Sequence, residues 1–297
     1  MTDRSSRRHY EIAGRGQRAR AYALVAGAVV LWASWPPLAT LVDVAPPFLV
    51  LGASALIGCL VSFVLAARQG SARSFVRVPF GTLVFVAAGL MGNNAFYLAA
   101  IARIGPAEAN VVHYLWPVFL VLIVAALHHR APTRAQALGV ALGFAGVATA
   151  LSPQMDGRLD AAGVLLGVCG ALTFAVYSAG RSVAKVEAGV VGPALGLAGI
   201  GALVAHAMLE SVYAPTIEEW LVIAAMGVGP FTIANVLWDR ATRVGEAPVI
   251  SGLAFLTPLV AIGLLGAYGL ASVGAAVVVG ALLAIIGAVL SSRTSSA

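Results

Sequence analysis

Ten apolar runs constrain the fold of this chain more than any other feature of its sequence. A helix of about 20 apolar residues crosses a hydrocarbon core of about 30 Å and bonds its own backbone polar groups internally. Strand-like alternation of polar and apolar residues is absent, which excludes an outer-membrane barrel. We place the ten predicted spans at residues 21–40, 47–67, 79–101, 106–127, 134–150, 161–180, 192–209, 218–239, 247–268 and 272–290.

The composition supports the same class of protein, because 60% of the residues are hydrophobic and only 10% are charged. A soluble domain has about 25% charged residues. The net charge of +6 does not indicate nucleic-acid binding, since the charges are confined to short loops and tails. Cys59 and Cys169 each lie inside an apolar run, so the sequence offers neither a disulfide framework nor a metal site, and we expect no cofactor.

The basic residues predict the orientation of the chain. The N-terminal tail, every second loop and the C-terminal tail hold 16 of the 18 Lys and Arg residues, and the other loops hold only Arg103 and Arg158. Basic residues favour the cytoplasmic side, so we expect both termini in the cytoplasm of a cell with a bacterial-type inner membrane. The first run is long and lacks a cleavage site, so we expect a retained helix rather than a signal peptide.

The two halves of the chain match each other at an offset of 141 residues. Pro117 then falls on Pro258, Gly139 on Gly280, and Gly146 on Gly287. Five helices per half would give the halves opposite topologies, which is a common architecture of secondary transporters. We therefore predict an all-α membrane protein of two inverted five-helix repeats around a central cavity. The predicted divisions are a cytoplasmic tail at 1–20, repeats at 21–150 and 151–292, and a tail at 293–297.

Polar and aromatic residues form stripes on six of the spans: the first, third, fourth, sixth, eighth and ninth. Such groups are costly in hydrocarbon unless they face the bundle interior or a water-filled cavity. Spans two, five, seven and ten are almost purely aliphatic, Gly or Ala, and we expect them to face lipid or brace the bundle. The candidate substrate-binding residues are Trp32, Asn94, Tyr97, Asn110, His113, Trp116, Tyr177, Asn235, Trp238 and Ser251, and the candidate hinges are Pro117 and Pro258.

Each candidate also has a simpler interpretation. Aromatic residues near span ends commonly form an interfacial belt, which we favour for Trp220 and Tyr268. His113 could be hydrogen-bonded to a neighbouring helix, and Thr173 could bond to its own helix. Pro117 and Pro258 could be simple kinks.

Several kinds of active site are missing from the sequence. No Asp or Glu lies near the centre of a span, and we expect no buried ion pair. A proton-driven antiporter usually keeps a carboxylate at mid-depth. The sequence also lacks a phosphate-binding P-loop and the HExxH and GxSxG motifs of hydrolases, so it predicts no catalytic residues.

Four stretches carry a resemblance to a known family: LWASWPP, NNAFYLAAIARIGPAEANVVHYLWPVF, LTFAVYSAGR and NVLWDRATRVGEAPVISGLAFLTPLVA. In these the chain resembles the drug/metabolite transporter superfamily, in its EamA-type ten-helix branch, and within it the bacterial aromatic amino acid exporters. The resemblance implies a cavity formed by the six striped spans, and it implies that Trp32 and Arg181 occupy positions where many members carry the same residues. The acidic residue that small drug-exporting relatives have in their first helix is absent here.

The sequence therefore predicts a facilitative secondary transporter, not an enzyme. It would export aromatic and other neutral amino acids by alternating access, as a monomer in the bilayer. The alternatives are an exporter of drugs, quaternary cations, nucleosides or other amphiphilic metabolites, or a non-transporting membrane protein or lipid-modifying enzyme. The residues alone do not choose among these substrates.

The orientation is testable by cysteine labelling of intact cells. We expect Asp156→Cys to react with an impermeant thiol reagent, because the sparsely basic loops are predicted to lie outside. Arg130→Cys should react only after the membrane is opened. Labelling of the second variant and not the first in intact cells would reverse the predicted topology.

Overall fold

The computed structural model describes residues 3–157, 160–183, 188–269 and 273–291. Within them every regular element is helical. The predicted C-terminal tail, the first residue of the tenth predicted span, Arg158 and Lys185 lie outside the described residues. The elements are α1 (Asp3–Ala33), α2 (Trp35–Ala39), α3 (Pro47–Arg68), α4 (Ala72–Val76), α5 (Phe80–Ile104), α6 (Pro106–His113), α7 (Trp116–His128), α8 (Arg134–Leu151), η1 (Ser152–Gln154), α9 (Ala161–Val183), η2 (Ala188–Val190), α10 (Val191–Leu209), α11 (Ile217–Met226), η3 (Gly227–Ile233), α12 (Ala234–Val244), α13 (Ala247–Ala254), α14 (Thr257–Ala267) and α15 (Ala275–Ser291).

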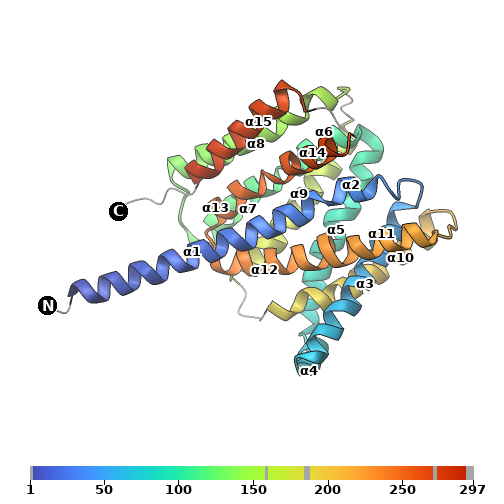
Figure 1. Cartoon of the computed structure of the whole chain (residues 1–297), viewed down its shortest axis with the longest axis horizontal. Helices are drawn as coiled ribbons and strands as arrows, with labels where there is room; N and C mark the ends of the chain where they lie inside the picture. Colours follow the sequence, from blue (N-terminus) through green and yellow to red (C-terminus); the bar gives the residue numbers. More distant parts are fainter. Residues whose placement is uncertain (1–2, 158–159, 184–187, 270–272, 292–297) are drawn as a thin grey trace.

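The ten predicted spans are confirmed as helical segments. In the described part of the chain, nine segments are long and apolar enough to cross a membrane, and α15 is a shorter apolar helix. The predicted N-terminal tail is helical rather than extended, because α1 continues through it from residue 3. Its residues include good helix formers such as Arg and Ala, with no proline before Pro36. Figure 1 shows this part of α1 projecting from the bundle.

Three spans are interrupted, and each interruption ends two residues before a proline. The first span breaks at Ser34, the fourth at Tyr114 and Leu115, and the ninth at Phe255 and Leu256. A proline has no N–H for the carbonyl four residues earlier, so a break at this point is expected. The breaks in the fourth and ninth spans are themselves 141 residues apart, the offset at which the two halves match.

The eighth span contains a feature that the sequence analysis did not predict. Between α11 and α12 the helix widens into a π-helical segment, η3, with Pro230 inside it. The Thr232 hydroxyl donates to the Gly227 carbonyl at 2.7 Å, and the Asn235 amide donates to the Phe231 carbonyl at 2.8 Å. These side chains bond carbonyls within the irregular turn, as the interior of a membrane requires.

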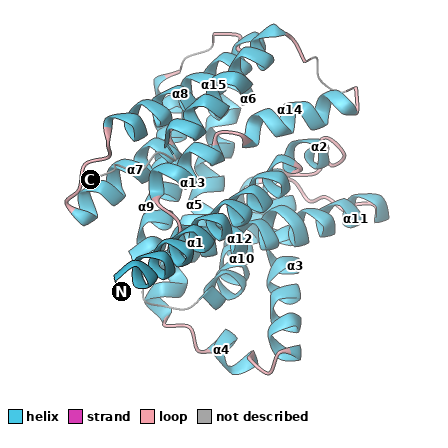
Figure 2. Cartoon of the chain, turned by 60° about the vertical axis from the view of Figure 1, so that its left-hand side comes forward, coloured by secondary structure: helices cyan, strands magenta, loops and turns pink. Residues whose placement is uncertain are grey.

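The helices pack in pairs that join the two halves of the chain. The main pairs are α3 with α10, α8 with α15, α5 with α9, and α1 with α12. In both views, α8 lies beside α15 and α1 lies beside α12 (Figures 1 and 2). At the offset of 141 residues, α1 corresponds to α9 and α12 corresponds to α5. The α1–α12 pair is therefore equivalent to the α9–α5 pair. These contacts are consistent with an inverted repeat, which remains a prediction.

Glycines bring α8 and α15 into close backbone contact. A Cβ at Gly146 would lie 2.6 Å from the Gly280 carbonyl oxygen, and one at Gly139 would lie 2.5 Å from the Gly287 carbonyl oxygen. Close approach through small residues is a common way for membrane helices to associate. The offset of 141 residues makes Gly139 equivalent to Gly280 and Gly146 equivalent to Gly287. Each contact therefore joins one of these positions in the first half to the other position in the second half, as a two-fold axis would require.

We expect Gly146→Ala to destabilise the protein by about 1–3 kcal/mol, because the new methyl group meets backbone atoms that have little freedom to move. Gly201→Ala is the matched control, since a Cβ there meets nothing within 4 Å. The measurement is the thermal unfolding of both purified variants in detergent. Equal unfolding temperatures would show that the α8–α15 contact is looser than described.

Candidate functional site

An aromatic cluster of five residues lies where four spans meet: Trp32 from α1, Trp116 from α7, Phe174 and Tyr177 from α9, and Trp238 from α12. The ring of Trp238 is 5.3 Å from that of Trp32 and 5.1 Å from that of Trp116. Phe174 lies 4.9 Å from Trp116 and 5.6 Å from Tyr177. The structure therefore brings together four of the ten residues that the stripes predicted.

One hydrogen bond fixes the centre of the aromatic cluster. The indole Nε1 of Trp238 donates to the hydroxyl oxygen of Ser178 at 2.9 Å, and both side chains are fully buried. This bond ties α12 to α9. Tyr177 is also buried, and its hydroxyl has no hydrogen-bond partner among the described residues. Buried polar groups are usually hydrogen-bonded, so the Tyr177 hydroxyl is an exception among the described residues of the aromatic cluster.

A buried ion pair lies directly beside the aromatic cluster. The Arg181 guanidinium on α9 binds the Asp239 carboxylate on α12 through two bonds, from Nε to Oδ1 and from Nη2 to Oδ2, the second at 3.2 Å. Their side chains are 1% and 0% exposed. The expectation of no buried ion pair was therefore wrong. Asp239 lies near the end of its span, as predicted, but α9 and α12 cover it completely.

A second group of residues forms a polar cluster: Asn93 and Tyr97 on α5, and His113 and Tyr114 on α6 and just after it. His113 Nε2 lies 2.6 Å from Asn93 Oδ1, which accepts the hydrogen bond. The rings of Tyr97 and His113 are 4.7 Å apart. The interpretation of His113 as a residue bonded to a neighbouring helix is thus correct, and it does not exclude contact with a substrate.

The remaining candidates occupy several environments. The Asn94 amide donates to the Leu90 carbonyl at 2.8 Å, and Asn235 bonds carbonyls within η3, so both amides support their own helices. Thr173 likewise donates to the Cys169 carbonyl. Asn110 is half-buried and Ser251 is fully buried. Among the described side chains, no hydrogen bond or ring contact connects Asn110 or Ser251 to either cluster.

The two clusters differ in their exposure. In the aromatic cluster only Trp32 is half-buried, and the other four members and the ion pair are buried. In the polar cluster Asn93, Tyr97 and His113 are all half-buried. The aromatic cluster and its ion pair are thus more buried than the polar cluster, in which Tyr114 alone is buried.

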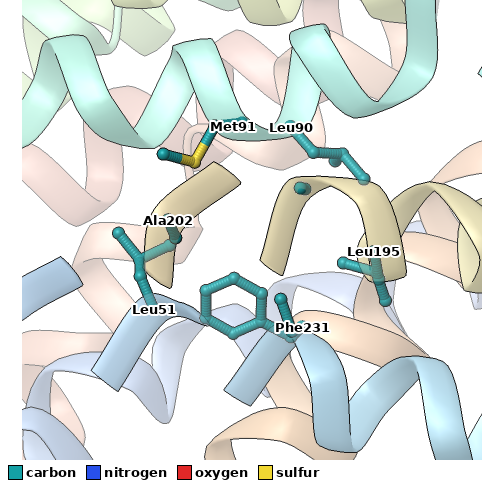
Figure 3. Close-up of a pocket in the computed structure, with 8 residues that line it drawn as sticks. Leu51, Leu90, Met91, Leu195, Ala202 and Phe231 are labelled. Carbon is teal, nitrogen blue, oxygen red and sulfur yellow. The ribbon is translucent and has the colours of Figure 1, made fainter. Parts of the chain in front are cut away.

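Two hollows can be described in the bundle. A small apolar cavity of about 10 Å³ lies among α3, α5, α10 and η3, and Figure 3 shows Leu51, Met91, Leu195 and Phe231 on its walls. It has room for about one water molecule and touches none of the candidate residues. A larger hollow of about 330 Å³ lies between α5 and α9, where Thr173 and Tyr177 contribute to its lining. The rings of Trp32, Trp116, Tyr177 and Trp238 pack against one another or against Phe174 in the aromatic cluster.

Comparisons with known proteins identify the family. The model of the EamA-like transporter family matches residues 19–152. A protein of Ancylobacter novellus named aromatic amino acid exporter YddG is 32% identical over 267 residues, which are 88% of this chain and 93% of that protein. The chain belongs to the EamA-like transporter family. A crystal structure of another protein, 28% identical, aligns with a TM-score of 0.87 over 93% of this chain and 98% of its own.

The comparisons confirm the resemblance that the sequence stretches carried. The protein is a multi-pass membrane transporter of this family, with the all-helical fold that its relatives imply. Sequence reasoning missed Phe174, Ser178 and the ion pair. One signal was available: Arg181 follows Tyr177, and Asp239 follows Asn235, at the four-residue spacing that places side chains on one helix face.

We expect Arg181→Gln and Asp239→Asn each to lower the free energy of unfolding by about 3–5 kcal/mol, because each leaves one buried charge without its partner. The double variant should recover most of this loss, since no buried charge remains. The measurement is a double-mutant cycle of thermal stability in detergent.

The matched control is Arg103→Gln, which removes one side of an ion pair with Asp160 whose side chains are 54% and 47% exposed. Its effect should stay below about 1 kcal/mol. Additive losses at residues 181 and 239 would contradict the coupling expected from their geometry.

Proposed function

We propose that this transporter exports aromatic and other neutral amino acids from the cytoplasm. The observation that carries the proposal is the buried aromatic cluster, which gathers rings from the first, fourth, sixth and eighth spans at one point. Aromatic pairs contribute about 0.5–1.5 kcal/mol beyond the burial of their surface, so an aromatic substrate side chain could replace a ring contact when the spans separate. The name of the Ancylobacter novellus relative supports this choice of substrate.

We propose alternating access as the mechanism, with the two five-helix repeats at 21–150 and 151–292 rocking about the breaks at Pro117 and Pro258. Two observations support it: the breaks in the fourth and ninth spans lie at equivalent places, and the aromatic cluster is more buried than Asn93, Tyr97 and His113. Asn94, Asn110, His113, Asn235 and Ser251 would supply neutral hydrogen bonds along the path. The protein would act as a monomer, with both termini cytoplasmic and without a cofactor.

We propose that transport is facilitated diffusion, driven by the substrate gradient alone. The only buried carboxylate among the described residues of the aromatic site is Asp239, and Arg181 balances its charge. A carboxylate that is held in this way is not a free proton carrier. Purified protein in liposomes should therefore equilibrate labelled phenylalanine, and removal of a pH gradient should not change the final distribution.

We expect Trp32→Ala and Tyr97→Ala to weaken phenylalanine transport up to about tenfold, since about 1.4 kcal/mol corresponds to one factor of ten. Both side chains are half-buried, so their loss should leave the fold intact. Threonine transport should change less, because its side chain has no ring to pack. The measurement is the initial rate of uptake per correctly inserted molecule.

Leu283→Ala on α15 is the control for a half-buried side chain away from both clusters. Equal transport by all three variants would mean that the aromatic residues only pack the bundle. Uptake of amphiphilic cations or nucleosides, with none of amino acids, would instead favour one of the alternative substrates.

A further inference from the structure

The Arg181–Asp239 pair is a buried pair of opposite charges for which the proposed transport cycle has so far given no task. It joins α9 to α12 through two charge-assisted bonds, and neither side chain reaches the surface. Both helices belong to the second repeat, so rocking of the two repeats does not by itself separate them, and any motion within that repeat that moves α9 away from α12 must break both bonds. Separation of α9 from α12 therefore requires new partners for the Arg181 and Asp239 charges.

Separating the pair without compensation is unfavourable, because each charge would lose its partner in a medium of low dielectric constant. Water could replace the partners only after the region had opened. A molecule that brings one negative and one positive group could replace both partners at once. The free amino acid is such a molecule at neutral pH.

The chemistry of the two side chains matches the two ends of an amino acid. A guanidinium offers parallel N–H donors that fit the two oxygens of a carboxylate, and this is the geometry that Arg181 already makes with Asp239. An ammonium group has three donors for the released Asp239 carboxylate. The exchange converts one ion pair into two and leaves no buried charge alone.

The surroundings of the pair fit the rest of such a ligand. Asp239 follows Trp238 in the chain, and Tyr177 lies one helical turn from Arg181. The Tyr177 hydroxyl is buried without a hydrogen-bond partner, and it interacts electrostatically with both charges. A ligand held at the pair would therefore reach an unused donor and the rings of the aromatic cluster together.

We propose that Arg181 and Asp239 form the receptor for the carboxylate and ammonium groups of a zwitterionic amino acid, which opens the pair by taking its place. The proposal rests on the proposed export of amino acids and names the groups that recognise the substrate. It also gives a basis for selectivity. A cation or an anion would satisfy one of the two charges and leave the other unpaired, so it would open the pair poorly.

The test compares phenylalanine with two analogues that each lack one charge, phenethylamine and 3-phenylpropionate. Full-length protein in liposomes is titrated with each compound, following tryptophan fluorescence for binding and counterflow for transport. We expect the wild type to prefer phenylalanine by at least about tenfold, because a polar site rejects analogues that leave its groups unpaired. In the double variant Arg181→Gln/Asp239→Asn the preference should fall to within about threefold.

The matched control is Arg103→Gln/Asp160→Asn, which neutralises the exposed pair and should retain the wild-type preference. A double variant at 181 and 239 that remains folded and keeps the tenfold preference would overturn the proposal. So would an equal loss for all three compounds, which would assign the pair a structural role alone. A wild type that moves no amino acid would instead refute the proposed function itself.

Discussion

Hydrocarbon offers no hydrogen bonds to the backbone, and the rest of this structure depends on that constraint. A proline inside a span removes a donor, and at two of the three breaks a short polar side chain bonds a nearby carbonyl. The Thr257 hydroxyl donates to the Ala254 carbonyl, the group that Pro258 leaves without its usual donor. The Ser34 hydroxyl donates to Leu31 at the break in the first span. At these two breaks a hydroxyl group supplies a bond to the backbone beside the interruption.

The same constraint governs the buried charges. Glu108 is 2% exposed, and its carboxylate accepts the backbone N–H groups of Asp156 and Gly157 at 2.7 and 2.9 Å. Glu210 accepts the N–H groups of Phe48 and Leu49 at the start of α3. These carboxylates bind backbone and stabilise loops or helix starts. Asp239 differs, because both of its carboxylate oxygens bind the Arg181 side chain, whereas Glu210 binds the His206 imidazole in addition to the backbone.

Much of the fold follows from local sequence. The length of an apolar run is enough to predict a membrane span, and the positions of Pro117 and Pro258 are enough to predict where the helices break. The stripe pattern also selected Trp32, Trp116, Tyr177 and Trp238, which meet in the aromatic cluster. The pairing of Arg181 with Asp239 depends on how α9 and α12 rotate against each other, which no spacing within one helix determines. The π-helical turn at Pro230 depends on close contact with α3, where a Cβ at Gly227 would lie 2.6 Å from the Ser54 carbonyl oxygen.

The two equivalent breaks are not chemically equal. Trp116 occupies the position that matches Thr257, and an indole cannot supply the hydroxyl that Thr257 gives to its carbonyl. The break at Tyr114 therefore lacks the hydroxyl-to-carbonyl bond that accompanies the break at Phe255, and the two bends are held by different sets of bonds. In the facilitative carrier that we propose, such inequality would bias the conformation in which the empty protein rests. It cannot shift the final concentration ratio of the solute, so it governs the speed of each half-cycle and leaves the endpoint to the gradient alone.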